Sequence, residues 1–127
     1  MEEQKICKSL GESGCYFFCL LKFANKENDA INIYKEAVAL NFMDKECYIK
    51  DPAALLKHLT NKKYCVVNQT ESPVDGDLII ARFANDRTGL RHFVIVDKNN
   101  NVTYDPLGES VTASEGYIES YRIFIGV

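Results

Sequence analysis

The chain lacks the features that mark an exported or membrane protein. Its 127 residues contain no run of about 18 apolar residues, the length that a membrane-spanning helix needs. The first ten residues, MEEQKICKSL, alternate charges with short apolar pieces and have no apolar core of the kind found in signal peptides. We therefore expect a cytoplasmic, soluble protein with no membrane partner.

Positive charge is also scarce. The 15 Lys and Arg residues are outnumbered by 18 Asp and Glu residues, and the two signs are interspersed along the chain. No basic stripe could follow a phosphate backbone, so nucleic acid is not an expected partner. No repeat, low-complexity tract or Pro/Gly linker divides the sequence. Its 46% hydrophobic and 26% charged residues are typical of a globular protein, and we expect one domain over residues 1–127.

Paired cysteines and zinc motifs are missing as well. The five cysteines are odd in number, irregularly spaced, and never in a C-x-x-C arrangement; they are Cys7, Cys15, Cys19, Cys47 and Cys65. In a chain without an export signal they should stay reduced, so we predict neither a disulfide framework nor a metal site. A zinc or redox role for Cys15 and Cys19 remains a minor alternative. The other cysteines are interpreted as small hydrophobic residues.

The periodicity of apolar residues changes halfway along the chain. Helical spacing predicts helices over 15–25, 29–42 and 52–60, the last with Asp51 as N-cap and Pro52 in its first turn. Short β-branched and aromatic runs predict strands over 64–68, 76–83, 91–97, 102–106 and 120–127. Helices followed by strands indicate an α+β fold with a mainly antiparallel sheet of about four to six strands.

One cysteine occupies a distinctive position. Cys15 follows Ser13 and Gly14 and starts a helix that is apolar nearly all round, on a face that it shares only with Cys19 and Lys22. A helix N-terminus and a neighbouring imidazolium both lower the pKa of a thiol and favour the nucleophilic thiolate. Cys15 is therefore a candidate nucleophile.

A histidine and a carboxylate are predicted to approach each other across a hairpin. If the turn of RHFVIVDKNNNVTYDPLG is centred on Asn99 and Asn100, Asp105 faces Val94 and lies on the same side of the sheet as His92. A register shifted by two would place Asp105 directly opposite His92. A carboxylate there would hold the imidazole in one tautomer and orientation. The competing interpretation is that Asp105, which precedes a proline, only starts a turn.

The motifs SGCYFF, HFVIVD and VTYDPLG, in this order, resemble the papain-like cysteine peptidase superfamily. The pattern is most similar to peptidases that process bacteriocin leaders, and SPVDGDLIIARF resembles a strand of bacterial cell-wall peptidases. The resemblance implies a papain-like fold with Cys15 as nucleophile, His92 as general base and acid, and Asp105 as its orienting residue. It also implies a peptide or protein substrate and no cofactor.

Two residues depart from the family pattern. Ser9 stands where relatives have a glutamine that donates to the oxyanion, and Tyr16 stands where many have a small residue. These departures favour an alternative in which a weak or inactive papain-like module binds a peptide or protein partner. Amidase, deamidase and acyl-transfer chemistry would use the same residues as peptidase chemistry. The sequence leaves the oligomeric state open.

Overall fold

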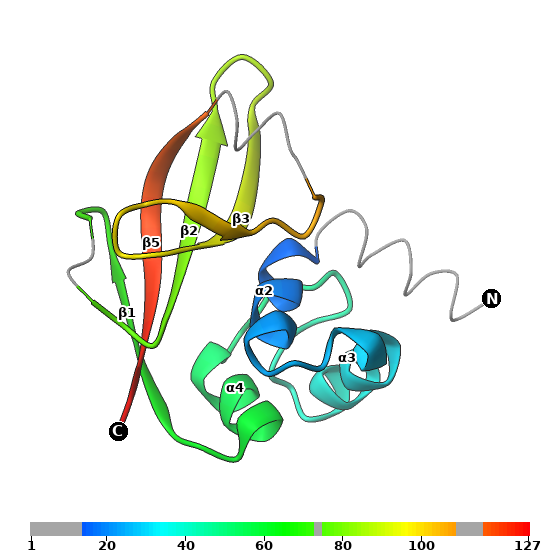
Figure 1. Ribbon diagram of the computed structural model, residues 1–127. Helices are drawn as coiled ribbons and strands as arrows, with labels where there is room; N and C mark the ends of the chain where they lie inside the picture. Colours follow the sequence, from blue (N-terminus) through cyan, green and yellow to red (C-terminus); the bar gives the residue numbers. More distant parts are fainter. Residues whose placement is uncertain (1–13, 73–74, 109–115) are drawn as a thin grey trace. The chain divides into compact units, whose positions relative to one another are not determined.

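The computed structural model describes residues 14–72, 75–108 and 116–127, and it shows an α+β protein as the sequence predicts (Figure 1). The chain divides into two compact units, the first ending at Lys63 and the second beginning at Tyr64. Helices make up the first unit and strands the second. The expectation of one domain over residues 1–127 stays a prediction.

The first unit contains all the helices of the described chain. They are α2 (Cys15–Phe23), the short 3-10 helix η1 (Glu27–Asp29), α3 (Ala30–Ala39) and α4 (Pro52–Thr60). None of the described helices is long and apolar enough to cross a membrane. Each α-helix buries one face, as the periodicity predicts; the most buried side chains are Phe17, Leu20, Leu21, Ile33, Ala37, Leu55, Leu56 and Leu59.

Each of the three α-helices is followed by an asparagine in the left-handed conformation. The φ angles of Asn25, Asn41 and Asn61 are 57°, 64° and 60°. This conformation lets the chain turn back and satisfy the last carbonyl groups of a helix, and asparagine adopts it more readily than most residues. The first two helices therefore end a few residues before the predicted limits of 25 and 42.

The start of α4 agrees with its predicted capping signal. Asp51 accepts a hydrogen bond from the Ala54 backbone N–H at 3.1 Å through its side chain, and Pro52 occupies the first helical position. The side chain satisfies one backbone donor that has no partner within the helix, and proline has no N–H to satisfy there.

The second unit is a five-stranded antiparallel sheet, within the range that the sequence predicts. Its order is β1-β5-β2-β3-β4, and Figure 1 shows β5 between β1 and β2. The strands are β1 (Tyr64–Gln69), β2 (Leu78–Asn85), β3 (Leu90–Val96), β4 (Val102–Tyr104) and β5 (Tyr117–Gly126). Alternation along the strands gives one face a hydrophobic cluster, which consists of Ile79, Ala81, Phe83, Val94, Val96, Tyr121 and Ile123 with Ile118 packed against it.

The turn between β3 and β4 is fixed to the interior strand β5. Asn100 has a φ of 66°, as a tight asparagine-rich turn requires. Its side-chain oxygen accepts a hydrogen bond at 2.7 Å from the hydroxyl of Tyr121, a buried residue of the hydrophobic cluster. Asp97 closes the turn by accepting from the backbone N–H groups of Asn99 and Asn101. The hairpin position therefore depends on β5 as well as on its own turn.

Candidate functional site

His92 lies on the inner side of β3. It is paired with Phe83 of β2 and alternates with Val94 and Val96, so it shares the face of the sheet that carries the hydrophobic cluster. Only 4% of the residue is exposed. Histidine is seldom buried this completely. His92 is therefore a buried residue of the sheet and not an exposed residue at the start of a strand.

Asp105 directly follows β4, whose pairing with β3 shifts register between Ile95 and Val96, so that the expected register holds at the end of the hairpin next to Asp105 but not at the turn itself. Tyr104 pairs with Ile95, and the next step of the same register brings Asp105 to the level of Val94. Its Oδ1 atom lies 2.6 Å from Nε2 of His92, and the side chain of each residue is 5% exposed. The structure therefore brings together the histidine and the carboxylate that the sequence singles out.

Asp105 also starts a turn, as its position before a proline predicts. The same Oδ1 atom accepts a hydrogen bond at 2.9 Å from the backbone N–H of Leu107, and the Asp105 carbonyl accepts one from Gly108. Gly108 has a φ of 80°, which glycine adopts without strain. Because the turn fixes the carboxylate on one side, the imidazole meets an acceptor that is already oriented.

The His92–Asp105 pair defines which ring nitrogen can take up a proton. A carboxylate accepts hydrogen bonds, so in the neutral imidazole Nε2 carries the hydrogen and Nδ1 carries the lone pair. When Nδ1 binds a proton, the imidazolium faces a carboxylate in a site with little water. That interaction is stronger than it would be in bulk solvent. The pair can therefore act as a base at Nδ1.

Cys15 belongs to the first unit, where it is the first residue of α2 and is half-buried. Gly14 is the N-cap, and its carbonyl accepts the hydrogen bond of Phe18 at 2.8 Å that closes the first turn. The first turn carries no acidic side chain. The partial positive charge of the helix N-terminus therefore acts on the sulfur without a neighbouring carboxylate in that turn, which favours the thiolate.

Cys47 is a neighbour of Cys15 that the sequence does not reveal. Burial, the Asp44 carboxylate and negative charge on Cys15 raise the pKa of Cys47, in that order, to about 11. Cys47 also has a φ of 67°, a conformation uncommon for a residue that is neither glycine nor asparagine. Nothing in the loop sequence indicates the proximity of Cys47 to Cys15, because the two residues are 32 positions apart.

Two further cysteines and the second histidine lie elsewhere in the described chain, and Cys7 lies outside the described residues. Cys19 is fully buried, so the predicted face of Cys15, Cys19 and Lys22 is not a continuous solvent-facing surface. Cys65 is exposed on β1. His58 is partly exposed and lies 3.0 Å from a Glu36 oxygen, in agreement with its predicted position at the flank of a helix. Across residues 14–72, 75–108 and 116–127, no three His, Cys, Asp or Glu side chains form a candidate metal-ligand group.

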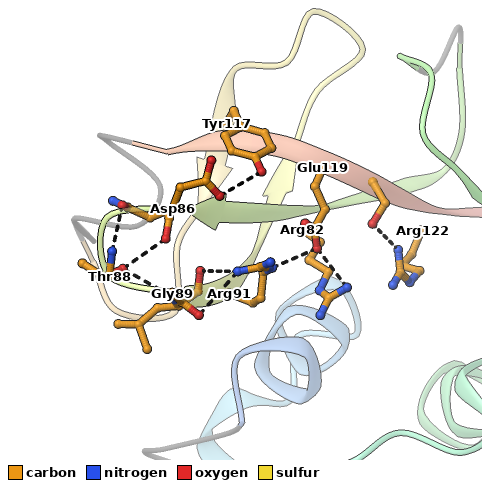
Figure 2. Close-up of polar contacts among 11 residues, drawn as sticks. Arg82, Asp86, Thr88, Gly89, Arg91, Tyr117, Glu119 and Arg122 are labelled. Carbon is orange, nitrogen blue, oxygen red and sulfur yellow. Dashed lines mark hydrogen bonds and ion pairs between the residues drawn. The ribbon is translucent and has the colours of Figure 1, made fainter.

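A group of arginines on the sheet was also missed from the sequence. Arg82 of β2, Arg91 of β3 and Arg122 of β5 lie on the face opposite the hydrophobic cluster, around Glu119 (Figure 2). The available signal was a charged residue inside each of the otherwise apolar runs LIIARF and YRIFI. Ser9, which stands where relatives have the oxyanion glutamine, lies outside the described residues.

The chain belongs to the family described as "Protein of unknown function, DUF261", whose family model matches residues 1–125. Comparison with curated proteins finds no match, and comparison with solved structures finds none either.

Proposed function

We propose that this protein is a thiol hydrolase that cleaves an amide or peptide bond, with Cys15 as nucleophile, His92 as general base and acid, and Asp105 as orienting residue. The observation that carries the proposal is the buried hydrogen bond of 2.6 Å between His92 and Asp105. A thiol at a helix N-terminus supports it independently. The resemblance of the three motifs to papain-like peptidases supports the same assignment.

The proposed reaction begins with transfer of the Cys15 proton to Nδ1 of His92. The thiolate attacks the substrate carbonyl carbon, and a tetrahedral intermediate forms whose oxyanion accepts a hydrogen bond from the Cys15 backbone N–H. His92 then gives its proton to the leaving nitrogen, the carbon–nitrogen bond breaks, and an amine and a thioester result. Water, deprotonated by His92, attacks the thioester, releases the carboxylic acid and regenerates the thiol.

Asp105 acts through His92 and does not touch the substrate in this scheme. Its hydrogen bond keeps the hydrogen on Nε2, so that Nδ1 is available for the proton from sulfur. Its charge stabilises the imidazolium that exists between the two proton transfers. A buried charged pair of this kind gives little net stability compared with apolar residues of similar volume, because both groups lose their hydration. That energetic balance favours a chemical role over a packing role.

A second function is a module that binds a peptide without cleaving it. Tyr16 favours this alternative, because a bulky residue follows the nucleophile directly and is half-buried in the first turn of α2. The histidine and carboxylate would then serve only to position the hairpin. The two functions predict different thiol reactivity.

The test is the rate at which iodoacetamide modifies each cysteine of the full chain at pH 6, followed by mass spectrometry. Cys15 should react faster than Cys65, which is exposed and serves as an internal reference. His92→Ala should remove this preference. His58→Ala is the matched control, because it removes a partly exposed histidine that pairs with Glu36, and it should leave the preference intact.

Equal rates at Cys15 and Cys65 in the wild-type protein would contradict the hydrolase proposal and favour the binding module. An unchanged preference in His92→Ala would show that the helix N-terminus alone activates the thiol. In that case His92 would not be the base.

A further inference from the structure

The arginine cluster, defined as Arg82, Arg91 and Arg122, lies on three adjacent strands of the sheet. Arg82 sits opposite Phe93 of β3 and Ser120 of β5. A bulge in β5 next to this position adds Glu119, and such bulges redirect side chains. The extra residue places its carboxylate among the arginines, as Figure 2 shows.

One carboxylate does not balance three guanidinium groups. Glu119 Oε1 lies 2.9 Å from Arg82 and 3.1 Å from Arg91, so both arginines share the same oxygen. Arg122 instead donates to the Ser120 hydroxyl at 2.8 Å, and no acidic side chain of the described chain forms an ion pair with it. The cluster therefore carries an excess of positive charge.

Two of these cations lie near the same aromatic ring. The guanidinium carbons of Arg82 and Arg122 lie 6.0 Å and 5.6 Å from the ring centre of Phe93. The ring attracts each cation and restricts its motion, but it does not cancel the repulsion between them. An anion between the two guanidinium groups would remove that repulsion.

Arg82 also has an unsatisfied donor. Its Nε atom is buried and has no hydrogen-bond partner within the described part of the chain. A buried donor without an acceptor is costly, and charged donors are the most costly. The rest of the side chain remains reachable, since 37% of it is exposed. Arg82 is therefore accessible through the rest of its side chain, while its buried Nε atom lacks an acceptor among the described residues.

We propose that Arg82 and Arg122, with Phe93 beneath them, bind a carboxylate of a peptide. A planar carboxylate has two oxygens that match the paired donors of guanidinium groups. A polyanion such as nucleic acid fits less well, because it needs a longer series of cations than this cluster and the net charge of -3 provide. Because the cluster lies on the face of the sheet opposite His92, this inference concerns a second binding site, separate from the proposed hydrolase site.

The carboxylate could come from an acidic side chain or from the C-terminus of a peptide. Three acetylated hexapeptides separate these sources: one with central glutamates and an amidated end, one with glutamines and an amidated end, and one with glutamines and a free C-terminal carboxylate. Binding is measured by calorimetry on full-length Cys15→Ala protein, which cannot turn the peptides over by the proposed route. We expect the glutamate peptide, the free-carboxylate peptide, or both to bind at least about tenfold more tightly than the neutral peptide.

Variants then assign the binding to the cluster. Arg82→Gln and Arg122→Gln, each made in this background, should weaken binding of the acidic peptide by about tenfold or more. Lys98→Gln is the matched control: it removes the same charge from an exposed turn and should change the affinity by less than about twofold. Glu119→Gln should have the opposite effect and tighten binding, because it releases Arg82 and Arg91 from their internal carboxylate.

Equal binding of acidic and neutral peptides would overturn the inference, as would an Arg122→Gln effect no larger than that of Lys98→Gln. The outcomes also separate this inference from the hydrolase proposal. Selective binding by Cys15→Ala with no cleavage by the wild-type protein would retain the carboxylate site and reject the hydrolase. Cleavage by the wild-type protein, together with equal binding of acidic and neutral peptides, would retain the hydrolase and reject the carboxylate site.

Discussion

Asp105 performs two tasks with one oxygen atom, which makes its substitution informative. The Oδ1 atom accepts hydrogen bonds from His92 and from the Leu107 backbone. Asparagine has the same shape and can keep the bond to Leu107, so the turn should survive. The negative charge that stabilises an imidazolium at His92 would be lost.

We therefore expect Asp105→Asn to slow the alkylation of Cys15 at pH 6 by between about 10-fold and 10⁴-fold. The upper figure is the loss of rate that follows when the triad carboxylate of another enzyme class is neutralised. Asp97→Asn is the control, since Asp97 also accepts hydrogen bonds from backbone N–H groups in a turn. In Asp97→Asn the alkylation rate of Cys15 should equal that in the wild-type protein. Equal effects of the two substitutions would assign Asp105 to the turn alone.

Cys47 provides a test of electrostatics within the first unit. Its pKa rises from 9.0 to about 11 on folding, chiefly through burial. Between these values the unfolded chain has released the Cys47 proton and the folded chain has kept it. The unfolded state then binds fewer protons, so this group lowers the free energy of unfolding as pH rises from 9 to 11.

Between pH 9 and 11 we expect the free energy of unfolding to fall by about 1 kcal/mol more in the wild-type protein than in Cys47→Ala. This figure is smaller than the full linkage value because solvent screens the interaction. Urea unfolding at several pH values measures it. At neutral pH and below, the two proteins should show a constant difference in the free energy of unfolding. Parallel curves up to pH 11 would show that Cys47 titrates normally in the folded protein.

At the scale of the elements, two aspartates at helix starts look alike in sequence but differ in structure. The Asp51 side chain accepts the Ala54 backbone N–H at 3.1 Å, whereas the Asp29 side chain makes no capping bond to α3 and accepts only from the Asn32 side chain. The preceding 3-10 helix η1 (Glu27–Asp29) already ends at Asp29, so α3 continues from a turn that has begun. Aspartate favours the N-cap position in both cases, but only Asp51 forms the capping hydrogen bond.

Asp51→Ala should therefore lower the free energy of unfolding by about 1 kcal/mol, the usual contribution of an N-cap side chain. Asp29→Ala should cost less than about 0.5 kcal/mol, as an exposed surface substitution does. Urea titration of both variants and the wild-type protein gives the comparison. Equal losses would mean that the hydrogen bond at Asp51 contributes nothing beyond local charge.

The sheet shows the other limit of prediction from sequence. Alternation along single strands predicts the His92 face and the hairpin register next to Asp105, because both depend on residues close in the chain. The arginine cluster depends on a bulge in β5 and on the order β5-β2-β3, which link residues about 30 to 40 positions apart. The alternation of apolar and polar residues within one strand does not show which strands lie beside it in the sheet. The excess charge at Arg122 therefore emerges only from the structure.

At the scale of the whole molecule, the α+β class and the number of strands follow from the change in periodicity near residue 61. The division of the chain at Lys63 occurs at the same place, because helices satisfy their hydrogen bonds locally while strands pair with distant segments. The proposed chemistry takes its thiol from the first unit and its base from the second. Fold class could be predicted from pattern alone, but a reaction shared by two units has to be tested in the intact chain.

This sharing gives a prediction for partial denaturation. If His92 activates Cys15, the preferential alkylation of Cys15 over Cys65 at pH 6 should disappear at the urea concentration that exposes the β3 amides to hydrogen exchange. It should do so even where the α2 amides are still protected, because the base belongs to the sheet. Cysteine alkylation and amide exchange can be read by mass spectrometry from the same samples. A preference that persists after β3 has opened, and ends only with α2, would locate the activation of Cys15 in the helix N-terminus and leave His92 without a part in it.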